Sequence, residues 1–111
     1  MSEDKDEDWY GYQFENYYTD SLTRNEKQLN SVFVKYEGIK MIVICDDKWW
    51  GDKKLYYYIK VPKKGLTYKN LYKQLDTQSK QYKTILDNDD HRFIEAITKK
   101  TDIEYDMWCG S

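Results

Sequence analysis

Alternating apolar and polar positions predict several β-strands in the middle of the chain. Residues 32–36, 39–45 and 54–61 are rich in β-branched and aromatic side chains, and turn residues separate these runs. Glu37 and Gly38 lie between the first two runs, so we expect a hairpin there, with Gly38 supplying a positive φ angle. An antiparallel meander is the simplest arrangement of the three strands.

The third run has the clearest alternation. It places Leu55, Tyr57, Ile59 and Val61 on one face and Tyr56, Tyr58 and Lys60 on the other. Pro62, which lacks an amide donor, ends this strand. Residues 46–53, which precede it, are expected to form a loop that carries Trp49 and Trp50.

Helical spacing of apolar residues predicts helices in the C-terminal third of the chain. Thr67 can cap a helix whose apolar stripe consists of Tyr68, Leu71, Tyr72, Leu75, Tyr82 and Leu86. Ser79 interrupts this stripe, so the helix either continues to about residue 86 or ends near Gln74 and gives way to an extended segment over 81–86. Aspartates at the start and lysines at the end of 90–100 predict a second helix there. Alternation over 103–107 predicts a final strand.

The N-terminal region is less regular. Residues 1–8 are almost wholly charged, and we expect a disordered acidic tail. Alternating aromatics over 9–15 predict a short strand, and Thr23 with Glu26 forms a capping box for a short helix over 22–30. Residues 9–111 are therefore expected to form a single α+β domain, an antiparallel β-meander of three or more strands with two C-terminal helices packed on one face.

Composition limits the class of protein. The chain has 111 residues, which fits one domain, and its 12 Tyr and 4 Trp compensate for a modest aliphatic content. The longest apolar run, 41–45, is far too short to cross a bilayer, and the acidic start lacks the features of a secretory signal. We therefore expect no membrane contact and a cytoplasmic location, that of the host if the protein is viral.

Cys45 and Cys109 have no metal or redox spacing, and Cys45 is expected to be a buried thiol.

Charge is strongly ordered along the chain although the net charge is only −2. Residues 1–20 contain seven acids and one base, residues 21–52 five of each, residues 53–83 nine lysines and one acid, and residues 84–111 seven acids and three bases. A basic block therefore lies between acidic ends.

Three interpretations of this basic block remain open. The lysines can simply solvate outer faces, where each ion pair contributes about 0–1 kcal/mol. They can bind single-stranded nucleic acid, with lysines contacting phosphates and tyrosines stacking on bases, although arginine is nearly absent. They can also form a protein interface, in which Tyr and Trp are favoured anchors. The candidate partner-binding residues are Trp49, Trp50, Lys53, Lys54, Tyr56, Tyr58, Lys60, Lys63 and Lys64.

The two adjacent tryptophans favour the interface. Neighbouring residues of an extended segment point to opposite sides, so one ring can cover the core while the other faces water beside charged neighbours. Alternatively, both Trp49 and Trp50 fold over a small core as a lid.

Catalytic and metal-binding motifs are weak. His91 is the single histidine, and an EF-hand loop opened at Asp87 would require Gly at 92 and Glu at 98, where the chain has Arg92 and Thr98. His91 with Asp89 or Glu95 offers only a minimal metal site, and the lysines before Gly65 lack the upstream glycines of a phosphate loop. We expect no enzyme activity and no cofactor.

The order of a hairpin, a helix containing Leu71 and Leu75, and then segments 82–90 and 102–105 resembles a ubiquitin-like β-grasp module of the PB1 type. The resemblance covers about residues 39–107. It implies homo-oligomers formed by head-to-tail pairing of a basic strand face with an acidic loop. Lys40 or Lys60 would lie on the basic side, and the acidic side would comprise Asp87, Asp89, Asp90, Asp102 and Glu104. The family places a strand where 90–100 has helical spacing.

These features together favour a non-enzymatic protein that binds a larger protein partner. Residues with AT-rich codons number 47 against 9 with GC-rich codons, which is typical of low-GC bacteria and their phages, among other sources. An inhibitor from a phage or mobile element that occludes the surface of a host defence enzyme would combine this codon usage, small size and absence of catalytic motifs. PB1-like oligomerisation and single-stranded nucleic-acid binding are the alternatives.

Overall fold

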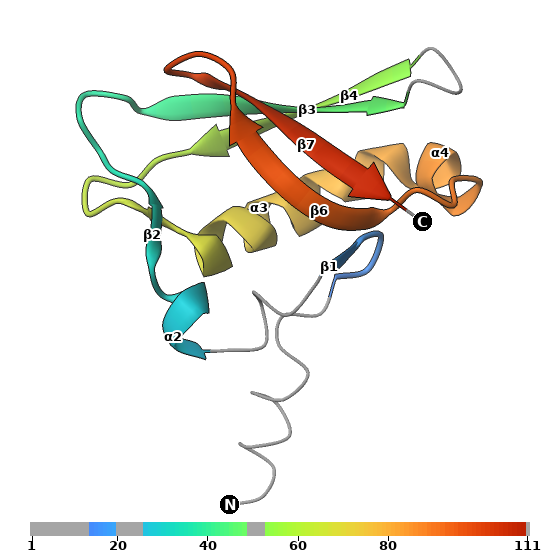
Figure 1. The fold of residues 1–111 in the computed structure, drawn as a ribbon, viewed down its shortest axis with the longest axis horizontal. Helices are drawn as coiled ribbons and strands as arrows, with labels where there is room; N and C mark the ends of the chain where they lie inside the picture. The colour runs from blue at the N-terminus through green and yellow to red at the C-terminus, as the bar shows by residue number, and fades with distance from the viewer. Residues whose placement is uncertain (1–13, 20–25, 49–52, 111) are drawn as a thin grey trace, which may run out of the picture.

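The computed structural model describes residues 14–19, 26–48 and 53–110. Their main feature is a five-stranded sheet in the order β1-β6-β7-β3-β4, with helix α3 packed under one face (Figure 1). A second sheet contains only β2 and β5. Within the described ranges, no helix is long and apolar enough to span a bilayer.

Strands β3 (Met41–Lys48) and β4 (Lys53–Lys60) form the long hairpin of the sheet. Leu55, Tyr57 and Ile59 are fully buried, while Tyr56, Tyr58 and Lys60 are exposed, so the predicted faces of this strand are confirmed. The inner face packs on Leu71 and Leu75 of α3, which are also completely buried. The strand ends before Pro62, as predicted.

The predicted hairpin around Gly38 is wrong. β2 (Val32–Val34) pairs instead with β5 (Leu66–Thr67), and β3 takes β4 and β7 as its neighbours. Gly38 does have the predicted positive φ of 84°, but it redirects the chain between two different sheets. The predicted loop over 46–53 is also shorter, because β3 continues to Lys48.

One helical stretch follows, in place of two separate C-terminal helices. α3 (Tyr68–Ser79) is capped by Thr67, whose hydroxyl accepts from the amide of Asn70 at 3.1 Å. A 3-10 turn, η3 (Lys80–Tyr82), then leads into α4 (Lys83–Asp87). α3 therefore ends at Ser79, whose buried hydroxyl donates to the carbonyl of Asp76 at 2.7 Å, but the chain stays helical beyond it. The alternative of an extended segment over 81–86 is wrong.

The predicted helix over 90–100 is a strand, β6 (Phe93–Lys99), antiparallel to β7 (Glu104–Gly110). A bulge between Ile94 and Ala96 inserts one extra residue. Ile94 pairs with Cys109 and Ile97 with Met107, so two residues three positions apart face the same side of the sheet. The bulge thus explains the helix-like spacing. The final strand is confirmed and is longer than predicted.

The main sheet is mixed, which corrects the predicted antiparallel meander. β7 runs parallel to β3 at the centre, and β1 (Tyr18–Thr19) runs parallel to β6 at one edge. The long crossover through α3 makes the parallel pairing of β3 and β7 possible. A hairpin, a helical stretch and a second hairpin follow one another along the chain. β6 lies within 90–100, where the β-grasp resemblance implies a strand, but most of the resembling segment 82–90 is helical.

The N-terminal predictions are tested only in part. A helical turn, α2 (Glu26–Leu29), lies within the predicted 22–30, while Thr23 is outside the described residues. The tail over 1–8 and most of the strand over 9–15 are also outside them. Phe14 packs edge-on against Tyr72 of α3 with ring centroids 5.3 Å apart. The first described segment, 14–19, therefore begins beside this helix.

Candidate functional site: an open sheet face and a basic groove

The face of the main sheet opposite α3 carries large exposed side chains. No helix of the described part covers this face (Figure 1). Tyr56 and Tyr58 of β4 are 39% and 53% exposed, and Trp108 of β7 is 56% exposed. Met41 of β3 is 46% exposed and lies opposite Lys60. We call these four side chains, Met41, Tyr56, Tyr58 and Trp108, the aromatic face.

Charges of both signs surround the aromatic face. Register places Lys54 opposite Asp47 and places Val43 next to Glu104, so lysines lie on the edge strand and carboxylates on the inner strands. A hollow of about 520 Å³ lies between Tyr56 and Trp108, with Val43 and Cys45 among the residues that line it. The indole nitrogen of Trp108 donates to the hydroxyl of Thr98 at 2.8 Å, which fixes the ring on the surface.

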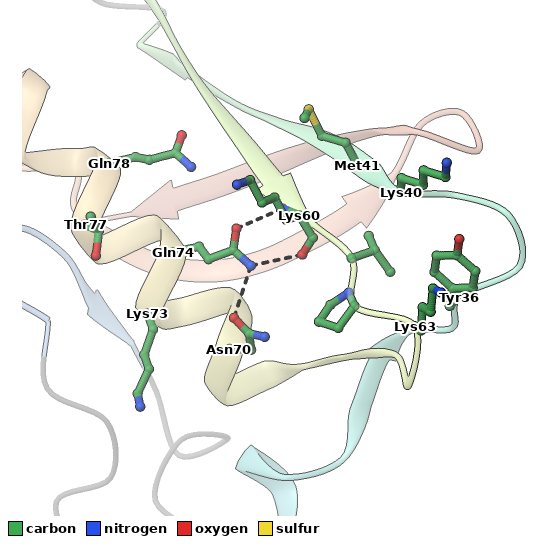
Figure 2. Close-up of a pocket in the computed structure, with 12 residues that line it drawn as sticks. Tyr36, Lys40, Met41, Lys60, Lys63, Asn70, Lys73, Gln74, Thr77 and Gln78 are labelled. Atoms are coloured by element: carbon green, nitrogen blue, oxygen red, sulfur yellow. Dashed lines mark hydrogen bonds between the residues drawn. The ribbon is translucent and has the colours of Figure 1, made fainter.

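A groove of about 950 Å³ lies between α3 and β4 and extends to the turn after β4 (Figure 2). Four lysines line it. They are Lys40, Lys60, Lys63 and Lys73. In Figure 2, Lys40 and Lys63 lie near the ring of Tyr36 at one end, and Lys73 leaves the helix at the other. We call this feature the basic groove.

Side chains of the helical stretch close the backbone edge of β4. Gln78 accepts from the amide of Tyr58 at 2.9 Å and donates to its carbonyl at 2.7 Å. Gln74 makes the same pair of bonds with Lys60, at 2.8 and 3.0 Å (Figure 2), and the hydroxyl of Tyr82 lies 3.2 Å from both the amide and the carbonyl of Tyr56.

The spacing explains this arrangement, which we call the glutamine ladder. Residues four positions apart on a helix are separated by about 6 Å, and residues two positions apart on a strand by about 6.7 Å. Positions 74, 78 and 82 therefore match alternate residues of β4. The ladder occupies groups that a neighbouring strand would use, which protects this edge against pairing with another chain.

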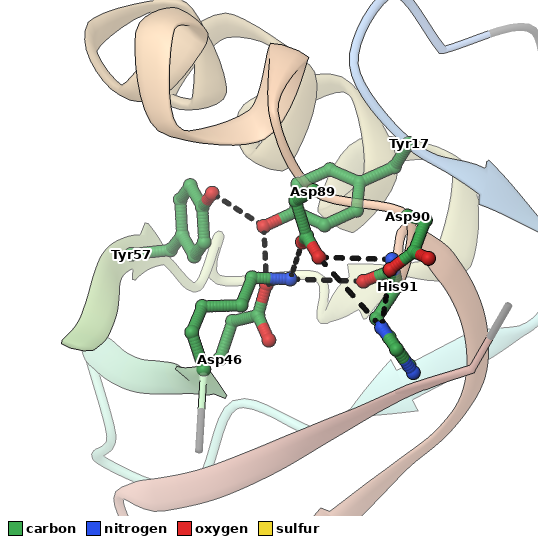
Figure 3. Close-up of polar contacts among 7 residues, drawn as sticks. Tyr17, Asp46, Tyr57, Asp89, Asp90 and His91 are labelled. Atoms are coloured by element: carbon green, nitrogen blue, oxygen red, sulfur yellow. Dashed lines mark hydrogen bonds and ion pairs between the residues drawn. The ribbon is translucent and has the colours of Figure 1, made fainter. Parts of the chain in front are cut away.

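A buried polar network lies at the other end of the β3–β4 hairpin (Figure 3). Lys48, only 1% exposed, forms ion pairs with Asp46 at 2.8 Å and with Asp89, and donates to the carbonyl of His91 at 2.9 Å. The hydroxyl of Tyr17 donates to Asp46 at 2.7 Å and lies 2.7 Å from the hydroxyl of Tyr57. The network therefore joins the N-terminal segment, the hairpin and the loop before β6.

Burial and charge shift the pKa values in this network. Burial raises the pKa of Asp46, although the ammonium of Lys48 opposes this. Burial alone would lower the pKa of Lys48, but its bonds to Asp46 and Asp89 outweigh burial and raise it. Burial, together with the charge of Asp46, raises the pKa of Tyr17 far above its ordinary value.

We expect the protein to lose stability as pH rises above about 10. Tyrosines of the unfolded chain ionise near 10.0, whereas folded Tyr17 keeps its proton, so the unfolded state releases more protons. The contribution of Lys48 is complete below its ordinary pKa of 10.5 and is also lost as pH rises through its raised pKa. Urea unfolding midpoints at about pH 8 and about pH 11 test this. A Tyr17→Phe variant should show a smaller drop, and an unchanged midpoint at high pH would contradict the expectation.

The described residues bring three possible metal ligands together, Asp89, Asp90 and His91. Asp89 is buried against the ammonium of Lys48, which already supplies the positive charge that a cation would bring. Nδ1 of His91 lies 2.8 Å from Asp90. Asp89 and the carbonyl of His91 therefore belong to the buried network, whereas Asp90 is exposed. Because Asp89 is buried, it cannot be one of the acidic residues that the PB1 resemblance would present to a partner.

The two thiols are not activated. Burial raises the pKa of Cys109, and burial together with Asp47 raises that of Cys45. A nucleophilic cysteine needs a lowered pKa, so neither thiol has the character of a catalytic group. Cys45 is half-buried on the open face, not fully buried as predicted.

The structure unites part of the predicted partner-binding set. Lys54, Tyr56, Tyr58 and Lys60 lie on one face of β4, and Lys60 meets Lys63 in the basic groove. Lys53 lies at the end of β4 that is far from Lys60, and Lys64 is exposed in the turn after β4. Trp49 and Trp50 are outside the described residues.

Sequence reasoning missed Trp108 and Met41 as parts of these surfaces, and it named Lys40 only as what the PB1 resemblance implies. Alternation along β7 could have revealed Trp108, because it has the same parity as the polar residues Glu104 and Asp106. Lys40 joins the groove through the antiparallel pairing of β3 with β4, a pairing that the predicted meander contains, because its carbonyl accepts from the amide of Val61 at 2.9 Å. Asp46 and Lys48, predicted to flank an exposed tryptophan loop, are buried, because their ion-pair partners come from distant segments.

No protein-family model matches the chain, and no curated protein and no solved structure matches it either. The functional argument therefore rests on the geometry of the two surfaces.

Proposed function

We propose that this protein is a non-enzymatic binding protein that covers a surface of a larger protein with its aromatic face. The observation that carries the proposal is the concentration of exposed Tyr56, Tyr58 and Trp108 on the uncovered side of the sheet. Tyr and Trp are the residue types most enriched among residues that dominate binding energy. A sheet presents them on a rigid support, so little conformational entropy is lost on binding.

Mixed charge on the same face favours a protein over a nucleic acid as the partner. The rings of Tyr56 and Tyr58 could stack on unpaired bases. A phosphate backbone laid across the sheet would, however, meet the carboxylates of Asp47, Glu104 and Asp106. A protein surface can place opposite charges against both groups and apolar side chains against the rings.

The excess of residues with AT-rich codons extends the proposal to the kind of target. We propose that the partner is a host enzyme, for example a defence nuclease, and that the protein comes from a phage or another mobile element. Inhibition would result from occlusion, since a rigid aromatic face can block access to an enzyme surface without chemistry.

Capture of a partner by the immobilised chain tests the proposal. We expect a host protein to be retained by the natural chain and lost with a Tyr58→Ser/Trp108→Ser double variant. The matched control is Val32→Ser, which removes an apolar side chain that is 47% exposed on β2, outside the main sheet. Equal recovery of the partner with both variants, each folded by circular dichroism, would contradict the proposal.

A further inference from the structure

The basic groove is separate in chemistry from the aromatic face. Its lysines Lys40, Lys60, Lys63 and Lys73 are all exposed, and none of its described lining residues is Asp or Glu. On the open sheet face, by contrast, lysines of β4 lie beside carboxylates of β3 and β7. Among the described residues, the groove is therefore a place where lysines cluster without carboxylates beside them. Its positive charge attracts anions.

The floor of the groove is apolar. Val61 and Pro62 follow directly after β4, and the ring of Tyr36 and the thioether of Met41 border the same space. Lysine stems add further apolar surface below their ammonium groups. A ligand that fits must therefore combine negative charge with apolar side chains.

The glutamine ladder determines how such a ligand can bind. The amides and carbonyls of Tyr58 and Lys60 are already bonded to Gln78 and Gln74. An extended peptide cannot add to this edge as a new strand without displacing both side chains. Recognition must come from side chains, with carboxylates at the lysines and apolar groups on the floor.

We propose that the basic groove binds an acidic peptide segment of a protein partner, with carboxylates paired to Lys40, Lys60 and Lys63. A peptide fits better than a nucleic acid, because the groove offers a single tyrosine ring and aliphatic groups in place of a series of stacking rings, and it has no arginine for fork-like phosphate contacts. This site goes beyond the proposed function. The two surfaces share Met41, and Lys60, which lines the groove, lies opposite Met41 in the hairpin.

Fluorescence anisotropy with a labelled 12-residue peptide of alternating Glu and Leu tests the proposal. We expect binding that weakens as salt is raised. A Lys40→Glu/Lys63→Glu variant should weaken it about tenfold or more, since two attractions become repulsions. The control Lys80→Glu/Lys99→Glu has the same net charge change on exposed lysines outside the groove, and should alter affinity less than about twofold. A Lys40→Gln/Lys63→Gln variant serves as the milder form if charge reversal unfolds the chain.

Several results would overturn this assignment. They are the absence of binding at low salt, equal losses with the two charge-reversed variants, and equal affinity for a matched Lys and Leu peptide. Tighter binding of a dT12 oligonucleotide, lost with the Lys40→Glu/Lys63→Glu variant, would assign the groove to nucleic acid instead. The Tyr58→Ser/Trp108→Ser variant should bind the peptide normally, so failure at the groove and failure at the aromatic face are distinguishable.

Discussion

Replacing Lys48 by methionine should lower the free energy of unfolding by about 3–5 kcal/mol. The ammonium of Lys48 is the positive charge between Asp46 and Asp89, and both carboxylates are almost inaccessible to solvent. Removing it leaves two buried negative charges that must either remain uncompensated or take up protons. The effect is several times that of a typical surface substitution.

Urea unfolding at neutral pH measures this effect. Lys53→Met is the matched control, because Lys53 lies directly opposite Lys48 in the hairpin but is exposed, and its loss should cost less than about 0.5 kcal/mol. Adding Asp46→Asn and Asp89→Asn to Lys48→Met should restore part of the stability, because the buried charges are then gone. A loss below about 1 kcal/mol for Lys48→Met would show that water compensates the carboxylates.

Removing the glutamine ladder with Gln74→Ala and Gln78→Ala should both destabilise the fold and expose an edge. Four hydrogen bonds to the backbone of β4 disappear, at a cost of about 0.5–1.5 kcal/mol each before water compensates them. Since this edge is partly open to water, we expect a total loss of about 2 kcal/mol. The freed amides and carbonyls of β4 then offer a template for another chain.

Size-exclusion chromatography over a range of concentrations, together with urea unfolding, tests both effects. The double variant should form dimers or larger species at concentrations where the natural chain does not change its elution. Gln81→Ala, an exposed glutamine of the same helical stretch, should alter neither property. A monomeric double variant of natural stability would show that the ladder neither supports nor protects β4.

Elements defined by local signals could be predicted from the sequence. β4 alternates without interruption, and its two faces and its end before Pro62 are predicted correctly. The hydroxyl of Thr67 does cap α3, since an N-cap depends only on residues within one turn. Simple alternation predicted a final strand over 103–107, which is confirmed as part of β7. In each case the element is determined by contacts between residues close in sequence or by the burial of alternate side chains.

The remaining elements depend on distant contacts. β6 was mistaken for a helix because its bulge sets Ile94 and Ile97 three positions apart on one face. The parallel pairing of β3 with β7 requires the whole intervening helix, and no local pattern encodes it. The sequence predicts a polar loop at Lys48, because its partners Asp89 and Tyr17 are far away in sequence.

The functional surfaces follow the same division. Tyr56 and Tyr58 were found because they alternate with core residues of β4. The basic groove could not be found from the sequence, because its lysines come from three different segments. Only the pairing of the hairpin and the packing of α3 bring Lys40, Lys60 and Lys73 to one place.

Titration calorimetry of the natural chain and the Tyr58→Ser/Trp108→Ser variant against the purified captured partner tests the central claim most directly. If the aromatic face is the contact, the variant should bind about 30-fold or more weakly, which corresponds to about 2 kcal/mol for residues that dominate an interface. Val32→Ser should bind as the natural chain does. An affinity of the double variant within about twofold of the natural value, with its fold intact, would contradict the claim.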